Sequence, residues 1–296
     1  MSLITDFVQS ADERNLQVWG IEVLKDGARV DGHHWVEDDR MNLRSGSKSF
    51  TSAAVGIAMS EGYFSREDRI ARYFEDKLPR DPSPLLLEMR VEDLLKMASG
   101  HERPYFLAEF ERWEDDDLAR HFLGMKIAHQ PGSVFMYNGG CTYMLSALLQ
   151  RTTGIRLRTY IQKKIFDALD IRNVQWLECP MGVSLGNSGL MINTVEAARF
   201  GQLLLQHGEW EGKQLIPRDY LELATTPRIA TNQENVWYGY QFWGERWEGA
   251  YSARGKYGQV ILVLPKQNAV IAITAHNEKD PNEILDAVDA CIIPKL

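Results

Sequence analysis

The sequence is poor in cysteine, in long apolar runs and in excess positive charge. Its three cysteines, Cys141, Cys179 and Cys291, are too widely spaced for a metal site or a disulfide framework and indicate a reducing compartment. No run of about 18 apolar residues occurs, so we expect no transmembrane helix and no membrane partner. The formal net charge of −8, without a basic stripe, argues against a nucleic-acid partner.

The N-terminal residues also lack the pattern of a secretory signal. They have neither a basic segment nor a continuous apolar segment. Leu3, Ile4, Phe7 and Val8 instead recur at helical spacing, which predicts an amphipathic helix that packs on the fold. We therefore expect a cytoplasmic protein.

Strand-like segments lie near both ends of the chain. Residues 17–35 form two such runs around a Lys-Asp-Gly turn, and residues 237–275 contain several more. This layout predicts an α+β fold, with an antiparallel sheet built from residues 1–66 and 179–296 and flanked by terminal helices. A mainly helical lobe, residues 67–178, is inserted, and the cleft between the two lobes is the expected place for a site.

Helical spacing of apolar residues marks the middle of the chain. It occurs in residues 91–98, 106–123 and 141–154, the last ending at a glycine suited to a helix C-cap. A further helix is expected from Thr194, as its N-cap, and a C-terminal helix from about Asn282. The aromatic residues of 237–247 are expected mostly in the core, with one or two lining an apolar pocket.

Lys48 stands at an unfavourable place in the small-residue segment 43–62. A positive charge near a helix N-terminus opposes the helix dipole, and burial disfavours it further, so both effects push a lysine toward its neutral form. A neutral lysine one turn from Ser45 can act as the base that makes the serine hydroxyl nucleophilic. The spacing Ser-x-x-Lys also arises by chance in a chain of this length, so the motif alone leaves a structural role open.

Tyr137 lies in a glycine-rich loop directly before a predicted helix. A phenol in such a loop can move protons between a serine and a leaving group. The alternative is a tyrosine that packs the loop onto the core. A second serine, Ser184, lies in a Gly-x-Ser-x-Gly sequence, but a glycine-containing loop follows it in place of the helix that a nucleophile elbow requires.

Several segments, in order, resemble the serine hydrolases of the penicillin-binding and class C β-lactamase type, a family that includes esterases and amide hydrolases. These segments are residues 44–62, 94–101, 130–154, 189–217 and 258–277. The resemblance implies that Ser45 is the nucleophile and that Lys48 and Tyr137 share the acid and base work. It also implies an oxyanion hole from the Ser45 N–H and an N–H near Gly255, and no metal or organic cofactor.

The sequence departs from the family pattern at two motifs. The family's Tyr-x-Asn is Tyr137-Asn138-Gly139 here, so the substrate-binding carboxamide is missing unless Asn138 replaces it. The family's Lys/His-Thr-Gly is matched in letters by residues 256–258, which fall at a predicted turn, whereas residues 253–255 fit the strand register.

Three charged or polar residues are further candidates for contact with a substrate. Arg254 or Lys256 would bind an anionic group if it faced the cleft, and an exposed hairpin turn is the alternative. His101 follows a Ser-Gly step whose loop the resemblance brings near the cleft, although a structural histidine is the simpler interpretation.

The sequence therefore predicts a serine hydrolase that forms an acyl-enzyme from a small ester or amide. One alternative is a β-lactamase or penicillin-binding enzyme of the D-Ala-D-Ala type, which the altered motifs disfavour. The other is a catalytically silent homologue that serves as a binding module, which the retained Ser45, Lys48 and Tyr137 disfavour. The sequence leaves the oligomeric state open.

Overall fold

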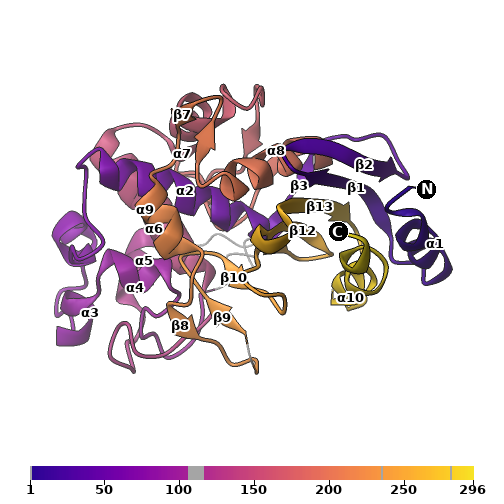
Figure 1. Cartoon of the computed structure of the whole chain (residues 1–296). Coiled ribbons are helices and arrows are strands. Elements are labelled where there is room, and N and C mark those ends of the chain that lie inside the picture. Colours follow the sequence, from indigo (N-terminus) through magenta and orange to yellow (C-terminus); the bar gives the residue numbers. More distant parts are fainter. Residues whose placement is uncertain (1, 106–116, 235, 281) are drawn as a thin grey trace.

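The fold is built on a long antiparallel sheet. The computed structural model describes residues 2–105, 117–234, 236–280 and 282–296. Within these residues the main sheet has eight strands. They are, in spatial order, β2 (Ala28–His34), β1 (Val18–Lys25), β13 (Ala269–Ala275), β12 (Gln259–Leu264), β11 (Tyr251–Gly255), β10 (Trp243–Gly244), β9 (Trp237–Tyr238) and β8 (Ile229–Ala230). The sheet thus joins both ends of the chain, as the strand-like segments predicted (Figure 1).

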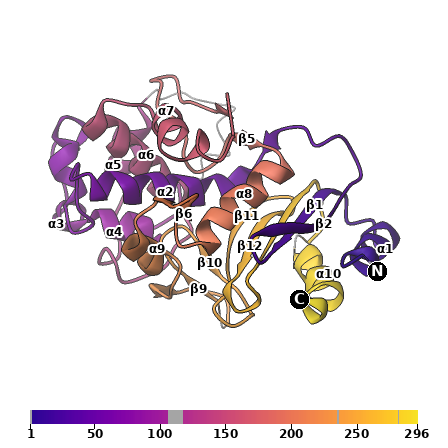
Figure 2. The same cartoon turned by 45° about the horizontal axis from the view of Figure 1, so that its top comes forward.

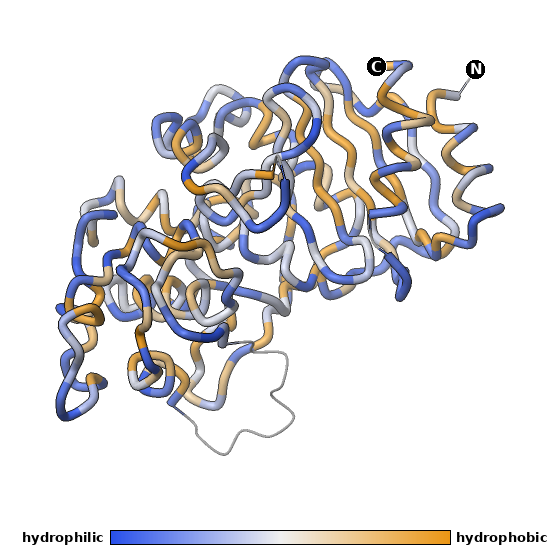
Figure 3. Tube along the Cα trace, turned by 90° about the horizontal axis from the view of Figure 1, so that it is seen from below, coloured by the Kyte–Doolittle hydropathy of each residue, from blue (hydrophilic) through white to orange (hydrophobic). Residues whose placement is uncertain are grey.

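The central strands carry apolar side chains on both faces. Every residue of β12 and β13 is buried, and both strands are rich in valine and isoleucine, which suit a doubly covered sheet. Figure 3 shows these strands as a hydrophobic layer beside the terminal segments. The β1–β2 hairpin turns at Asp26 and Gly27, which both have positive φ, of 53° and 80°, as a tight hairpin turn requires.

Helices cover both faces of this sheet. The terminal helices α1 (Thr5–Glu13) and α10 (Asn282–Cys291) lie together over one face and share a hydrophobic cluster with it (Figures 1 and 2). Helix α8 (Thr194–Leu205) packs on the other face, where Gly201 lets the helix approach Ile261 and Val270 closely. The α+β fold with flanking terminal helices is confirmed.

The remaining helices lie beside or beyond α2 (Ser47–Ser60), of which all but the last two residues are buried. They are α3 (Pro84–Glu88), α4 (Val91–Leu95), α5 (Leu118–Gly124), α6 (Gly139–Thr153), α7 (Leu157–Ile161), the π-helical segment Gln162–Phe166 and α9 (Arg218–Ala224). Short 3-10 segments are Arg44–Gly46, Ile70–Tyr73, Glu75–Lys77, Pro265–Gln267 and Ile293–Lys295. Residues 106–116 of the predicted helix 106–123 lie outside the described residues.

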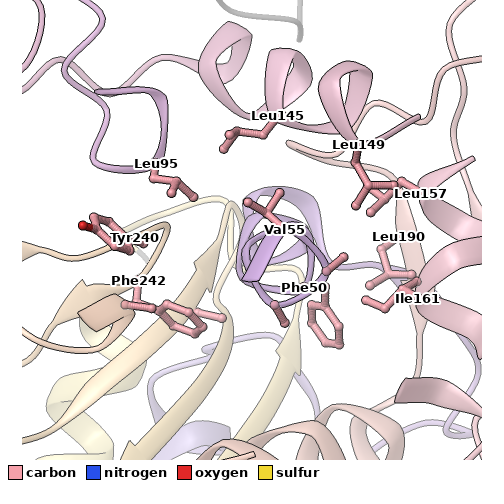
Figure 4. Close-up of a cluster of buried hydrophobic side chains, with 14 of the residues drawn as sticks. Phe50, Val55, Leu95, Leu145, Leu149, Leu157, Ile161, Leu190, Tyr240 and Phe242 are labelled. Atoms are coloured by element: carbon pink, nitrogen blue, oxygen red, sulfur yellow. The ribbon is translucent and has the colours of Figure 1, made fainter. Parts of the chain in front are cut away.

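Figure 4 shows apolar side chains that enclose α2 from several directions. Phe50 and Val55 of α2 lie between Leu145 and Leu149 of α6 on one side and Phe242 on another. A small sheet lies beside the start of α2. Its strands, in spatial order, are β3 (Met41–Asn42), β5 (Leu190–Ile192) and β4 (Gln175–Trp176). A hairpin of β6 (Glu209–Trp210) and β7 (Lys213–Gln214) follows α8.

The caps of two helices test the sequence expectations. Helix α6 ends at Gly154, which has a φ of 72°, as predicted. Helix α8 is capped by Asn193 and not by Thr194, because the Asn193 side chain accepts from the Glu196 N–H while the Glu196 carboxylate accepts from the Asn193 N–H. The Thr194 hydroxyl instead bonds to Thr274, 2.7 Å away.

In the part of the chain that the structure describes, the helices are too short or too polar to cross a membrane.

Candidate active site

Ser45 lies on a tight turn ahead of the buried helix. The 3-10 turn Arg44–Gly46 carries it, and α2 begins two residues later, at Ser47. Arg44 has a positive φ of 53°, and its N–H donates to the Asn42 side chain at 2.8 Å. The turn therefore holds Ser45 at the N-terminal end of α2, where it is half-buried.

Lys48 contacts Ser45 directly. Its Nζ lies 2.9 Å from the Ser45 Oγ and donates to the main-chain carbonyl of Asn187 at 2.8 Å. The side chain is almost wholly enclosed, with Lys48 only 3% exposed. Burial lowers the pKa of Lys48 to about 7, because the described surroundings supply no carboxylate to offset the loss of solvent. A large fraction of this lysine is therefore neutral at neutral pH.

Tyr137 is the third candidate catalytic residue, and it contacts both Lys48 and Ser45. Its ring centroid lies 5.0 Å from the Lys48 Nζ, and its hydroxyl forms a side-chain hydrogen bond with Ser45. Burial raises the pKa of Tyr137 to about 12, although the bond to Ser45 acts in the opposite direction. The ring packs against Trp243 and Tyr238, with centroids 5.3 and 6.2 Å away.

Gly255 brings strand β11 against the turn that carries Ser45. A Cβ atom added at Gly255 would overlap the main-chain carbonyl oxygen of Leu43. Only glycine allows the two backbones to approach this closely. The backbone at the end of β11 is therefore adjacent to the Ser45 turn, which is the arrangement that an oxyanion hole of two backbone N–H groups needs.

Asn138 and Gly139 lie beside these residues in different roles. Asn138 is fully buried and caps α6, with its Oδ1 accepting from the N–H groups of Gly140 at 2.9 Å and Tyr105 at 3.0 Å. This capping uses only the Asn138 Oδ1, because the Nδ2 is buried without a hydrogen-bond partner among the described residues. Gly139 opens α6, and a Cβ atom there would lie 2.9 Å from the Asn187 Nδ2.

Arg254 and Lys256 have contacts with other residues of the chain. Arg254 is paired with the buried carboxylate of Glu245, its Nε donating at 2.7 Å, and that carboxylate also accepts from Ser252. This pairing argues against Arg254 as a ligand for a substrate anion. Lys256 is exposed in the β11–β12 turn, with its Nζ 4.7 Å from the centroid of the Tyr257 ring.

His101 is part of the framework near the site. Its Nε2 lies 3.0 Å from the Phe122 carbonyl and its Nδ1 lies 2.8 Å from the Ser99 Oγ. Burial lowers the pKa of His101 to about 4, so the ring is neutral, donating to Phe122 and accepting from Ser99. Both ring nitrogens are thus engaged by the protein, which argues against a contact with substrate.

Asn187 is the site residue that sequence reasoning missed. It contacts Lys48 through its backbone, which no side-chain pattern reveals, and its one sequence signal is the glycine-rich loop that contains it. The same loop contains Ser184, which is fully buried and is followed by β5, not by a helix. Ser184 therefore lacks the exposure of a nucleophile elbow.

A serine hydroxyl between a partly neutral amine and a neutral phenol has the parts required for acyl transfer. Comparisons with known proteins agree with this chemistry. The 6-aminohexanoate-dimer hydrolase of Paenarthrobacter ureafaciens is 26% identical over 276 residues, covering 85% of this chain and 69% of that protein. The lovastatin esterase of Penicillium rubens is 25% identical over 160 residues, covering 47% of this chain and 40% of that protein.

The fold is also shared with solved structures. One from Bacillus anthracis, provisionally named a 6-aminohexanoate-dimer hydrolase, superposes with a TM-score of 0.83 at 23% identity and covers 97% of this chain and 80% of its own. The family model described as Beta-lactamase matches residues 7–290. Because this match spans nearly the whole chain, the protein belongs to the beta-lactamase family and is a serine hydrolase.

Proposed function

We propose that the protein hydrolyses a small ester or amide through an acyl-enzyme on Ser45. The observation that carries this proposal is the contact of 2.9 Å between the Ser45 Oγ and a lysine amine whose pKa burial lowers to about 7. A protonated amine cannot accept the serine proton, whereas a neutral one can. The two pKa values, about 7 for Lys48 and about 12 for Tyr137, favour the lysine as base and the phenol as acid.

Acylation then follows in balanced steps. The Ser45 Oγ attacks the substrate carbonyl carbon while Lys48 takes the hydroxyl proton. The N–H groups of Ser45 and of β11 near Gly255 stabilise the oxyanion. As the tetrahedral intermediate collapses, the Tyr137 hydroxyl gives its proton to the departing alcohol or amine, and Lys48 returns a proton to Tyr137. A water molecule then attacks the acyl carbonyl and gives a proton to Tyr137, which passes its own proton to Lys48. Lys48 returns that proton to the Ser45 Oγ as the bond to the acyl group breaks and the carboxylic acid leaves.

The substrate class is supported by relatives and by the charged residues near the site. Relatives named as a hydrolase of an aminohexanoate dimer and as an esterase favour linear amides or esters. The pairing of Arg254 with Glu245 disfavours the carboxylate recognition that β-lactams and D-Ala-D-Ala peptides need. The half-buried Trp243 beside Tyr137 offers an apolar wall to such a substrate.

A substrate panel with three proteins tests this function. Wild type, Ser45→Ala and Lys48→Ala are compared on p-nitrophenyl esters, p-nitroanilides and nitrocefin. We expect turnover of an ester or an anilide by wild type only, and little turnover of nitrocefin. Dominant nitrocefin hydrolysis would favour the β-lactamase alternative, and a wild type without any turnover would favour a silent binding module.

We also propose a cytoplasmic location, a small-molecule partner and a two-lobe division at residues 67 and 178. Support for the location comes from the cysteines, because Cys141 and Cys179 are buried free thiols and Cys291 is unpaired as well. The net charge of −8 disfavours nucleic acid as a partner. Cell fractionation with an antibody against the protein tests the location, and enrichment in the periplasmic or secreted fraction would contradict it.

A further inference from the structure

A cavity outside the Ser45 site lies where α1 meets the start of β1 and the end of β2 (Figure 1). Its volume is about 290 Å³, near the lower end of the range for pockets that bind small molecules. Trp19 and Trp35 line it together with Asp12, Asn15 and Gln17, and its other lining residues are apolar. Both indoles are half-buried. Among the lining residues that the structure describes, the cavity thus combines two aromatic rings with one carboxylate and no basic side chain.

Contacts with neighbouring groups hold the two indoles in place. The Trp19 ring stacks on His276, with ring centroids 5.5 Å apart and an angle of 13° between the planes. The Trp35 ring contacts the His33 ring edge-on at 4.5 Å, and its indole N–H donates to the Asp12 Oδ1 at 2.7 Å. The main-chain N–H of Trp35 also donates to the Trp19 carbonyl at 2.9 Å. Rings fixed in this way lose little conformational entropy when a ligand binds.

The charge around the cavity favours a cation. Asp12 forms no ion pair with any residue that the structure describes, and Arg14, close to it in sequence, pairs instead with Glu283 at 3.6 Å. In the same described residues, no arginine or lysine lies over either indole. The acidic residues 37–39 directly follow Val36, which also lines the cavity. On a chain with a net charge of −8, these groups attract a positively charged ligand.

A second pair of an indole and a carboxylate in this structure is already in contact with a cation. The Trp247 indole N–H donates to the Asp289 Oδ1 at 2.6 Å, as the Trp35 indole does to Asp12. There the guanidinium carbon of Arg246 lies 5.4 Å from the centroid of the Trp247 ring, and the Arg246 Nη1 lies 4.0 Å from the Asp289 carboxylate. The chain thus pairs these two groups with a cation at Trp247, whereas at Trp35 its described residues supply none.

We propose that the cavity between Trp19 and Trp35 binds a methylated ammonium group. The faces of the two indoles attract the positive charge, and tryptophan is the aromatic residue that does so most strongly. The Asp12 carboxylate adds a Coulomb attraction at the edge of the cavity. A quaternary ammonium donates no hydrogen bond, so it suits a cavity whose walls are rings and not a set of acceptors, and it leaves water more readily than a lysine-like ammonium.

The cavity and Ser45 lie at opposite ends of one series of contacts. Trp19 stacks on His276, His276 stacks on Tyr257 at 4.5 Å, and the guanidinium carbon of Arg44 lies 5.3 Å from the Tyr257 centroid. Arg44 directly precedes Ser45. The cavity is therefore separate from the groups that carry out acyl transfer. The proposal does not rest on the proposed function, and Ser45→Ala should bind the cation as wild type does.

A titration with choline, followed by nuclear magnetic resonance of the indole N–H groups, tests the site. The signals of Trp19 and Trp35 are identified by their loss in Trp19→Phe and Trp35→Phe. We expect both signals to shift and to saturate, with a Kd on the order of 1 mM for a ligand of this size. The neutral carbon analogue of choline, with a tert-butyl group in place of the trimethylammonium group, should bind about tenfold more weakly.

Two charge-removing variants form a matched pair. Asp12→Asn keeps the shape of the side chain at the cavity and removes its charge, so we expect the Kd for choline to rise about twofold to fivefold. Asp289→Asn removes the same charge from the indole–carboxylate pair at Trp247 and should leave the Kd unchanged. Trp19→Leu removes one of the two rings and should raise the Kd about threefold to thirtyfold.

Phosphatidylcholine vesicles distinguish the source of the ammonium group. Co-sedimentation that free choline reverses would assign a lipid headgroup, and choline binding without co-sedimentation would assign a soluble cation. Three results would overturn the proposal: no saturable shift of the Trp19 or Trp35 signal, equal affinity for choline and its neutral analogue, or equal effects of Asp12→Asn and Asp289→Asn. None of these results depends on hydrolysis, so each would leave the proposed function intact.

Discussion

Lys48 has a position that disfavours its charge and suits its proposed role. Ser45, Asn187 and the ring of Tyr137 surround its amine, and the side chain is only 3% exposed. Burial disfavours the ammonium form, which is why the pKa of Lys48 falls from 10.5 to about 7. The same burial makes the neutral amine available as a base near neutral pH.

The activity of the wild type should rise with pH through the pKa of Lys48. Below a pH of about 7 the amine is protonated and cannot accept the Ser45 proton, so kcat/KM should fall about tenfold per pH unit there. Above it kcat/KM should level off, because Tyr137 keeps its proton until a pH of about 12. Steady-state kinetics between a pH of about 5 and about 9 measure this rise in kcat/KM. A profile that is flat or falls with rising pH would contradict the base assignment.

Replacing Lys48 by methionine should stabilise the fold while removing activity. Methionine fits a long buried site without a charge, so we expect the free energy of unfolding at pH 7 to rise by about 1–3 kcal/mol. The folded pKa of about 7 lies below the ordinary 10.5, so the unfolded chain binds more protons between these values and wild-type stability rises with pH there. The gain from Lys48→Met should therefore shrink as pH rises toward 10.5. Urea unfolding at several pH values measures it, and a loss of stability at pH 7 would contradict the account.

Only some residues of the candidate site could be predicted from the sequence, because only some of their contacts are between residues close together in the chain. Ser45 and Lys48 are one helical turn apart in sequence, so their contact follows from local geometry. Asn187 acts on Lys48 through a backbone carbonyl from a distant loop, and such a contact depends on tertiary structure alone. His101 and Asn138 looked available in sequence because their partners, the Phe122 carbonyl and the Tyr105 N–H, are far along the chain.

At the level of elements, the site depends on how closely β11 approaches the Ser45 turn. Gly255 ends β11 and faces the Leu43 carbonyl without room for a side chain. The neighbouring positions differ, because Ala253 joins the core while Arg254 pairs with Glu245. The strand therefore positions its last backbone groups toward the turn and its charged side chain away from it.

Gly255→Ala should lower activity with little change in secondary structure. The new Cβ would overlap the Leu43 carbonyl oxygen, a backbone atom, so the turn must shift and Ser45 with it. A displacement of about 1 Å is enough to lower kcat on the order of a hundredfold. Kinetics and circular dichroism on the same sample measure both effects.

Gly124→Ala is the matched control for this prediction. Gly124 ends α5 and has open space where a Cβ would stand, so its substitution should leave kcat unchanged. Equal activity of Gly255→Ala and Gly124→Ala would contradict the importance of the close approach.

Elements with strong local patterns could be predicted and short ones could not. The β1–β2 hairpin, α6 and the β12–β13 hairpin follow from turn residues and periodicity. Strands β8, β9 and β10 are two residues long, too short for any period to be visible. The cap of α8 was assigned one residue late because Asn193 and Thr194 are both good cap residues, and only the reciprocal bond of Glu196 distinguishes them.

The two faces of the main sheet carry different hydrophobic clusters, and only one of these clusters lies around the candidate site. One hydrophobic cluster lies under α1 and α10, on the face away from α2 and α8. The larger cluster contains α2, α6 and α8 and lies around the site. The antiparallel sheet and its terminal helices were predictable because strand patterns occur at both chain ends, whereas which loops meet at Ser45 was not.

Leu285→Ala should therefore destabilise the protein without altering the site. Leu285 is buried in α10 and belongs to the cluster of the far face. Truncating a buried leucine costs about 2–5 kcal/mol. Thermal unfolding should shift to a lower midpoint, while kcat/KM at a temperature where the variant is folded should match wild type. A selective loss of activity in folded Leu285→Ala would contradict the separation of the two faces.

The central claim is that Ser45 forms the acyl-enzyme, and the most direct measurement is to locate the covalent adduct. The protein is treated with a fluorophosphonate at pH 8 (roughly one unit above the pKa of Lys48), digested and mapped by mass spectrometry. Ser45→Ala and Lys48→Ala are treated in parallel. The account predicts one adduct, on Ser45, in wild type and none in either folded variant. An adduct on another residue such as Ser184, or undiminished ester hydrolysis by Ser45→Ala, would contradict it.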